Sequence, residues 1–437
     1  MKIWQKNKEN ETNELVERFT VGNDQFFDGL LATYDIRGSI AHAKMLGSVG
    51  LLEEQEVQAL VKELEVQLKQ AEAGTFVIEA GVEDVHSQVE KNLIAALGDT
   101  GKKIHTGRSR NDQVAVDIKL FLKDKIKEVT QAVKELFDVL IHQSNTYKTV
   151  GMPGYTHMQV AMPSSVGLWL GSFAESFVDD LEMLVGAYRI IDKNPLGSGA
   201  GYGSVFPLDR QMTTELLGFN TLNWNSINAQ YGRGKGEKAL AAALSFIAST
   251  LSRLSMDCCL FMNENYQFIT FPKELTTGSS IMPHKKNPDV FELIRAKCNR
   301  IQAVPNELNL LTTNLTTGYH RDIQLTKEIL FPAIEDVVDA LKMAALMMRN
   351  CSVNTEAIND EKYNNLYSVN AINQLIIKGI PFRDAYVSIG QQIENGTFDA
   401  SSYKADVPEK AHEGSVFRLC NKEIEEAFDE VFNKIGR

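Results

Sequence analysis

The feature that most constrains the fold is one long run of apolar residues spaced three and four positions apart. It comprises Val114, Ile118, Phe121, Leu122, Ile126, Val129, Val133, Leu136, Phe137, Leu140 and Ile141, with Lys and Glu between them. This spacing is typical of an amphipathic helix with a coiled-coil-like seam. At about 1.5 Å per residue, such a helix is roughly 40 Å long.

Four further segments have the same periodicity, and together they predict an extended helical bundle. They span residues 166–191, 235–262, 290–311 and 323–348. Alternating β-branched runs are scarce, so we predict an all-α protein. Two apolar stripes in this region suggest packing between subunits, although they could instead face each other within one chain. The first stripe is Val133, Leu136, Phe137 and Leu140, and the second is Leu168, Trp169, Phe173 and Phe177.

The flanking segments differ from the long-helix region, and this difference predicts three domains. Residues 1–105 hold shorter helical patterns interrupted by glycines, which indicates a small N-terminal helical domain. Residues 106–350 form the central long-helix bundle. Residues 351–437 have shorter patterns again, with a turn at residues 378–381, and are expected to form a small C-terminal helical domain. The Gly-rich residues 195–200 follow no βαβ pattern, so we interpret them as a tight interhelical turn.

Composition and charge exclude several classes of partner. The net charge of −12 and the pI near 5.3 argue against binding to nucleic acid or to an anionic membrane surface. The five cysteines lack metal-ligand spacing and read as reduced core thiols. The N-terminus is polar, and no uninterrupted apolar run approaches the roughly 20 residues that span a bilayer. We therefore expect a soluble cytoplasmic protein.

The most distinctive local motif is GSSIMPHKKNP at residues 278–288. Glycine, two serines and a Met-Pro break are typical of a mobile loop, and an apolar helical pattern begins directly after Asn287 and Pro288. A serine hydroxyl, the ammonium of Lys285 and the amide of Asn287 all lie within this short run. Such a loop beside a helix N-terminus suits the binding of an anion next to a proton-transfer group.

Two other motifs join this loop in a recognisable set. They are TGRSRNDQ at residues 106–113 and GYTHMQ at residues 154–159. The three segments, in this order and approximate spacing, resemble the motifs of the fumarase/aspartase superfamily, and within it those of the argininosuccinate lyase family. The resemblance runs from about Asp35 to about Arg383.

This resemblance implies a fold, an assembly and a reaction. The implied fold has three domains, and its central helices form a twenty-helix core in a homotetramer whose active sites are each built from three subunits. The implied reaction is the reversible elimination of fumarate from argininosuccinate to give arginine, the last step of arginine biosynthesis. It proceeds through an aci-carboxylate carbanion and needs no metal or organic cofactor.

Cleaving a C–N bond next to a carboxylate requires a base, stabilisation of a carbanion and help for the departing nitrogen. Ser279 is the best candidate for the base, and Lys285 together with backbone N–H groups would have to favour its alkoxide form. Lys285 and Asn287 are expected to hold the substrate carboxylate. The resemblance places the functional groups at Ser279 and Lys285 rather than at the adjacent Ser280 and Lys286.

His157, within GYTH, is the second catalytic candidate, and Thr156 before it is a candidate substrate contact. The resemblance pairs His157 with Glu292 in a relay near the serine, because a carboxylate would fix the imidazole tautomer and raise its basicity. The sequence leaves open whether His157 acts as an acid, as a base through water or as an orienting group.

The remaining candidates would bind substrate. Ser109, Arg110 and Asn111 resemble the family's contacts to the fumarate end, since a guanidinium fork suits a carboxylate. Asp112 then fits the first turn of the following helix, where it would act as a cap. The resemblance adds four candidates for binding the arginine end, which are Tyr319, Gln324, Lys327 and Asp28. It also adds His86, which lies in an Asp-Val-His segment.

The chain departs from the family pattern at Asp24, Val160, Met162 and Arg321, and over residues 228–235. These departures bear on recognition of the arginine portion and leave the elimination chemistry untouched. Two alternatives stay open: a superfamily lyase acting on adenylosuccinate, aspartate or malate, and a structural protein of the lens crystallin kind. The intact set Ser279, Lys285, Asn287, His157 and Glu292 argues against the second.

Overall fold

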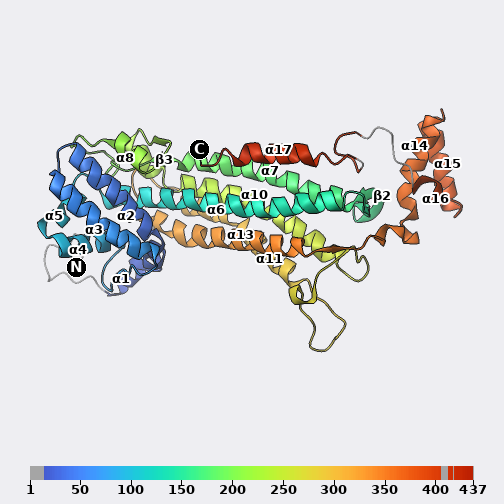
Figure 1. Ribbon diagram of the computed structural model, residues 1–437, viewed down its shortest axis with the longest axis horizontal. Coiled ribbons are helices and arrows are strands. Elements are labelled where there is room, and N and C mark those ends of the chain that lie inside the picture. The colour runs from blue at the N-terminus through green and yellow to red at the C-terminus, as the bar shows by residue number, and fades with distance from the viewer. Residues whose placement is uncertain (1–13, 405–411, 417, 437) are drawn as a thin grey trace.

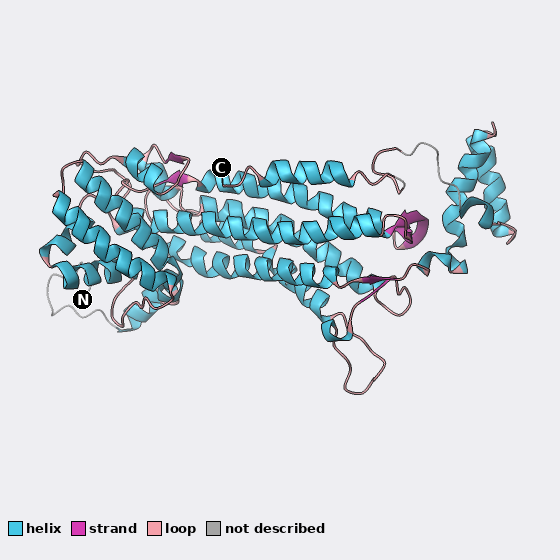
Figure 2. Cartoon of the chain, in the orientation of Figure 1, coloured by secondary structure: helices cyan, strands magenta, loops and turns pink. Residues whose placement is uncertain are grey.

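The computed structural model describes residues 14–404, 412–416 and 418–436. The molecule is elongated and mostly helical, as predicted, and Figure 2 shows its strands only as short pairs between helices. A long central bundle has a group of N-terminal helices at one end and helices α14 to α16 beyond the other end (Figure 1).

The N-terminal group packs around its own apolar core, in which Ile36, Leu46, Leu60 and Leu93 are fully excluded from solvent. Helix α3 begins with a capping box in which the Glu53 and Glu56 side chains each bond to the backbone of the other residue. The elements of this group are α1 (Glu14–Val21), α2 (Asp24–Ser48), α3 (Glu54–Glu72), α4 (Val85–Leu97), α5 (Asp99–Lys102) and η1 (Lys103–His105).

The central bundle buries the largest apolar cluster of the molecule. Helix α6 packs against α7 and α13, and α10 packs against α7, α11 and α13. Helix α10 is apolar and long enough to cross a membrane by composition alone, but its position among these helices accounts for that composition. The bundle consists of α6 (Arg110–Thr146), α7 (Val166–Ile191), α10 (Lys235–Phe261), α11 (Asp289–Ile301), α12 (Val304–Leu311) and α13 (Thr326–Arg349).

The predicted helices match these elements except at one break and one helix start. The prediction of a single helix over residues 290–311 is wrong, because α11 ends at Ile301 and α12 begins at Val304. Pro305 explains this break, since its ring would clash with the Ile301 carbonyl in a continuous helix. The pattern at residues 323–348 begins in a 3₁₀ turn, η3 (Arg321–Leu325), before α13.

The two apolar stripes do not mark a subunit interface, and that part of the prediction is wrong. Leu136, Phe137 and Phe177 are buried within a single chain and belong to the same cluster. Phe137 also stacks on Phe428 of α17 (Asn421–Phe432), which returns along α7 from the C-terminal segment (Figure 1). The alternative interpretation, that the stripes are covered within one chain, is the one the structure supports.

The strands are few and short among the described residues. An antiparallel hairpin joins β1 (Gly151–Thr156) to β2 (Gln159–Ser165), and periodicity did not predict it. Two small pairs connect distant segments: β3 (Lys193–Asn194) with β4 (Thr221–Leu222), and β5 (Ile269–Thr270) with β6 (Ser352–Val353). The other elements are α8 (Arg210–Leu216), α9 (Ser226–Tyr231), η2 (Lys273–Leu275), η4 (Ala357–Asn359), η5 (Glu361–Tyr367), α14 (Ser368–Ile377), α15 (Phe382–Glu394) and α16 (Ser401–Lys404).

Candidate active site

A cavity of about 200 Å³ lies where the N-terminal helices meet the start of the long bundle. Its wall comes from α1, α2, α4, α6, η3, α13 and the turns beside them. Seven residues predicted to bind substrate line it: Asp28, His86, Arg110, Asn111, Tyr319, Gln324 and Lys327. Asp24, Glu83, Asp84, Arg233 and Arg321 complete its charged lining.

The N-terminus of α6 is held rigidly beside this cavity. Ser109 is the N-cap, and its backbone N–H donates to the Asp112 carboxylate at 2.8 Å in a capping box. The other Asp112 oxygen accepts from the N–H groups of Gly197 and Gly199, at 2.9 and 3.0 Å. The predicted cap at Asp112 is therefore confirmed, and the Gly-rich turn fastens the helix start to the bundle.

Arg110 and Asn111 stand in the first turn of α6, half-buried in the cavity wall. The Arg110 guanidinium donates to Glu83 at 3.2 Å and contacts the Asp84 carboxylate as well. Asp84 is itself the N-cap of α4, where it accepts from the Ser87 N–H at 2.9 Å. A ligand carboxylate at Arg110 would therefore compete with two acidic side chains of the protein.

A buried ion-pair cluster closes another side of the cavity. The Lys327 ammonium lies 2.5 Å from Asp28 and 2.6 Å from Asp24. Burial and the neighbouring Asp28 charge raise the pKa of Asp24 to about 6, although Lys327 opposes that rise. Asp24 and Asp28 are one helical turn apart on α2, so both carboxylates face the same lysine.

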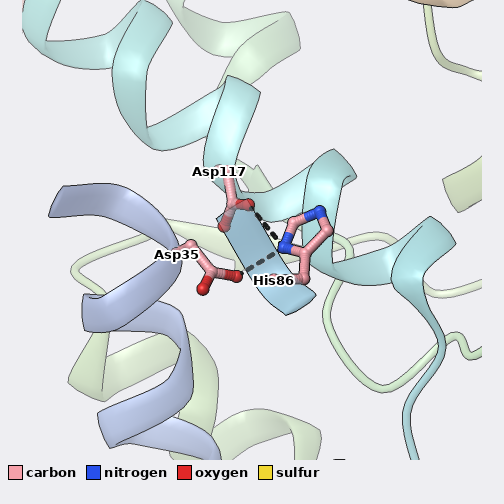
Figure 3. A group of neighbouring side chains, drawn as sticks. All are labelled: Asp35, His86 and Asp117. Carbon is pink, nitrogen blue, oxygen red and sulfur yellow. Dashed lines mark hydrogen bonds and ion pairs between the residues drawn. The ribbon is translucent and has the colours of Figure 1, made fainter. Parts of the chain in front are cut away.

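His86 lies in the cavity wall, beside two buried aspartates (Figure 3). Its Nδ1 is 2.7 Å from Asp35 Oδ1 and 3.6 Å from Asp117 Oδ2. Burial alone would lower the pKa of His86, but the charge of Asp35 and the hydrogen bond to it raise that pKa to about 8. The donor atoms of this trio lie within 4.8 Å of one another, so it is also the candidate metal-ligand set of the described residues.

The η3 segment supplies the outer rim of the cavity. Arg321 donates to the Thr20 carbonyl at 3.0 Å and to Gln324 Oε1 at 3.1 Å. Gln324 also donates to the Thr20 carbonyl, at 3.1 Å, while Tyr319 stays half-buried. These hydrogen bonds hold η3 against the end of α1, so the rim of the cavity depends on the contact between these two elements.

The loop of residues 278–288, which carries the GSSIMPHKKNP motif, does not line this cavity. Figure 1 shows the segment between β5 and α11 projecting from the side of the bundle, away from the N-terminal helices. Ser279 Oγ accepts from the Met282 N–H at 3.1 Å, and the side chain of Lys285 is exposed. Asn287 closes the loop base through its N–H to the Thr277 carbonyl at 2.8 Å. Glu292 is exposed in the first turn of α11.

Thr156 and His157 lie in the β1–β2 hairpin at the far end of the bundle (Figure 1). His157 and Met158 form the two-residue turn with φ of 53° and 59°, values that side-chain-bearing residues seldom adopt. Both side chains are exposed. A strained turn that presents a histidine to solvent is typical of a functional position. Val160 and Met162 are exposed on β2.

One chain therefore assembles only part of the predicted site. The cavity holds the candidates for the substrate ends, whereas the hairpin turn lies beyond the opposite end of α6. At 1.5 Å per residue, the 37 residues of α6 separate these groups by about 55 Å. The loop residues Ser279, Lys285 and Asn287 also stand apart from the cavity.

Sequence reasoning missed several charged residues of this region. Asp35 and Asp117 were not predicted, and neither were Glu83 and Arg233, while Asp84 was recognised only as part of the Asp-Val-His segment. A usable signal existed for the aspartates of α2. Asp24, Asp28 and Asp35 are spaced four and seven residues apart, which places three acids on one face of a largely buried helix.

The sequence is similar to a known family over most of its length. Residues 7–303 match a family described as "Lyase". An argininosuccinate lyase of Parabacteroides distasonis is 53% identical over 97% of this chain and 94% of that protein. One from Bacteroides thetaiotaomicron is 51% identical over 100% of this chain and 97% of that protein.

Solved structures agree on the fold. A variant of EDDS lyase with bound fumarate is similar with a TM-score of 0.76, at 21% identity, over 98% of this chain and 91% of that one. A class II fumarase from Schistosoma mansoni is similar with a TM-score of 0.72, at 18% identity, over 90% and 93% of the two chains. These likenesses show that the chain has the same fold as these solved lyase and fumarase structures, as predicted.

Proposed function

The chain belongs to the lyase family that includes the argininosuccinate lyases, and on this basis we propose that it cleaves argininosuccinate into arginine and fumarate. The observation that carries the proposal is identity above 50% across the whole chain to proteins of that name. Such a carbon–nitrogen lyase would serve the last step of arginine biosynthesis. We expect it to work in the cytoplasm.

The elimination removes a proton from the carbon next to a succinyl carboxylate, forms the C=C bond of fumarate and breaks the C–N bond to the guanidino nitrogen. In this proposal the Ser279 alkoxide takes the proton. Lys285 and Asn287 hold the carboxylate while negative charge develops on it, which should be the largest stabilising effect. The electrons of the C–N bond leave with the guanidino nitrogen. That nitrogen takes up one proton, which matches the proton removed from carbon, so no net proton is gained or lost.

His157 would stand near Ser279 with Glu292 as its partner. Its exposure at a strained turn suits a group that completes its site only against another surface. Thr156 would contact the same end of the substrate. The substrate-binding role of the cavity rests on its lining, in which guanidinium, ammonium and imidazole groups alternate with carboxylates. A zwitterionic ligand with three carboxylates and a guanidinium matches such a mixed wall.

The separation of about 55 Å between the cavity and the hairpin supports an assembly in which several chains complete each site. We propose a homotetramer with active sites shared between subunits. Large apolar side chains stay exposed along three bundle helices and offer surface for that packing. They include Phe246, Met256, Leu293, Met343 and Leu346.

The direct test is the ultraviolet absorbance of fumarate released from argininosuccinate by the purified protein. Adenylosuccinate, aspartate and malate serve as alternative substrates under the same conditions. Release of fumarate from argininosuccinate alone would support the proposal. Preference for one of the other three would indicate another lyase of the same superfamily. No fumarate release from any of the four substrates would favour a structural role.

A further inference from the structure

We propose that Asp35 is a positioning residue that keeps His86 in its imidazolium form and aims the Nε2 N–H into the cavity, where it binds a ligand carboxylate. The identity of the ligand rests on the proposed function. The chemistry, a cation held ready for a carboxylate, rests on the arrangement around His86 alone.

The geometry gives the two ring nitrogens different surroundings. Nδ1 faces both aspartates, with Asp35 in hydrogen-bond distance at 2.7 Å and Asp117 farther away at 3.6 Å. In Figure 3 the second nitrogen points away from both carboxylates. His86 lines the cavity, and among the described residues no hydrogen bond reaches its Nε2. A proton on Nε2 would therefore be available to a ligand.

Three carboxylates lie close enough to the ring to influence its protonation. Asp35 and Asp28 on α2 and Asp117 on α6 favour the imidazolium form. His105, which precedes α6, also interacts with the ring, but burial and the neighbouring Arg108 lower its own pKa to about 4, so it is uncharged at neutral pH. The balance raises the pKa of His86 to about 8, so the ring is mostly charged at neutral pH.

The two aspartates are not equivalent. Burial and the neighbouring Asp35 raise the pKa of Asp117 well above its usual range, whereas His86 lowers the pKa of Asp35 despite its burial. Neither carboxylate oxygen of Asp117 has a hydrogen-bond partner. Asp35, with its lowered pKa and its 2.7 Å contact, is therefore the main ionised partner of His86, and the raised pKa of Asp117 weakens its share of the charge beside the ring.

The same trio has the donor types of a divalent-cation site, but its surroundings favour the imidazolium. Arg108 is half-buried and interacts with Asp35 and Asp117, and its guanidinium donates to Ser39 Oγ at 3.0 Å. A divalent cation among these aspartates would lie near that fixed charge in a medium of low dielectric constant. An imidazolium and a guanidinium already provide positive charge beside these aspartates.

The other cations of the cavity already contact carboxylates. Lys327 is shared by Asp24 and Asp28, and Arg110 is engaged by Glu83 and Asp84. His86 contacts Asp35 through Nδ1 and keeps a second donor, Nε2, without a partner among the described residues. Arg233, the other lining cation with unpartnered donors, lies 3.7 Å from Glu237. A ligand carboxylate at Nε2 would gain a charge-assisted hydrogen bond without displacing an acidic side chain.

The experiment compares ligand binding by calorimetry in the intact assembled protein between about pH 7 and about pH 9, across the His86 transition. The probes are fumarate, arginine and agmatine, which is arginine without its α-carboxylate. For the wild type, the Kd of the probe whose carboxylate meets His86 should rise about tenfold over this range. A rise for arginine but not agmatine assigns the amino-acid carboxylate, and a rise for fumarate assigns the other end.

Three variants complete the test. His86→Gln should abolish the pH dependence, and Asp35→Asn should weaken binding at neutral pH and move the transition to lower pH. Asp117→Asn is the comparison in the same cluster and should move the transition to lower pH by less than Asp35→Asn does. If Asp35→Asn does not fold, the comparison of wild type with His86→Gln still decides.

Several outcomes would overturn the inference. These are a flat Kd for both fumarate and arginine, a transition that persists in His86→Gln, or binding that requires an added divalent metal and is lost with chelator. Product binding is measured without turnover, so it tests the role of His86 independently of the proposed lyase activity. Absence of fumarate release with a normal His86 profile would count against the lyase activity alone.

Discussion

Arg110 opens helix α6, and His157 lies in the hairpin that follows the opposite end of the same helix. Because that helix is continuous and about 55 Å long, the two side chains cannot meet within one chain. Any site that uses both must take them from different chains. The substrate-binding cavity and the hairpin histidine of the proposed mechanism are thus separated by the fold itself.

Mixing two inactive variants should restore activity if the sites are shared. We expect Arg110→Ala and His157→Ala each to be inactive alone. After joint refolding in equal amounts, about a quarter of the sites should combine an intact Arg110 with an intact His157 from another chain, given random assortment in a symmetric oligomer. The fumarate-release assay on the mixture measures this. A mixture no more active than its parents would show that one chain supplies both residues.

Ser279→Ala should abolish proton abstraction while leaving substrate binding largely intact. We expect kcat to fall by at least about a thousandfold, which corresponds to roughly 4 kcal/mol of transition-state stabilisation. Ser280→Ala is the matched control, since it removes a hydroxyl from the adjacent exposed position of the same loop. Fumarate release and the Kd for fumarate would be compared. Equal turnover numbers for Ser279→Ala and the wild type would remove serine from the mechanism.

Lys327→Met should destabilise the protein, because it leaves Asp24 and Asp28 facing each other without a cation. Breaking a buried pair from one side costs about 3–5 kcal/mol. Adding Asp28→Asn should recover part of that loss, and thermal denaturation at fixed protein concentration measures both changes. The exposed pair of Lys91 and Glu79, 2.7 Å apart, provides the control. Lys91→Met should leave Tm almost unchanged, and an equal loss there would contradict the assignment.

The protein should lose stability as the pH rises through the His86 transition. The folded pKa of His86, about 8, exceeds its ordinary value of 6.5, so its protonated form stabilises the fold. That stabilisation is complete below about pH 6.5, declines between the two values and is absent above about pH 8. The difference amounts to about 2 kcal/mol. Denaturant titrations across this range should show the slope in the wild type and not in His86→Gln. Identical slopes in the two proteins would refute this linkage.

The sequence predicted best those features of the fold that depend on residues close together in the chain. The helix over residues 166–191 followed directly from periodicity, and the cap at Asp112 followed from its position before an apolar run. The break after Ile301 was missed because Pro305 lies inside the apolar pattern and does not interrupt it. The hairpin turn at His157 lacks the glycine that usually marks such turns.

The charged surroundings of His86 could not be read from the sequence for a different reason. Asp35, His86 and Asp117 belong to α2, α4 and α6, and only the packing of those three helices brings them together. The resemblance to a family supplied His86 as a candidate without its partners. Likewise, the motifs located Ser279 and His157 but not their distance from the cavity.

The length of α6 has an evolutionary consequence. Helix α6 sets the distance between two parts of the proposed active site. Substitutions on its exposed surface leave that distance unchanged, whereas a change in its length alters it. One inserted residue would turn everything beyond it by about 100° and shift it by about 1.5 Å. We therefore expect homologues to tolerate substitutions on the exposed face of α6, yet to place their insertions and deletions in the connecting loops.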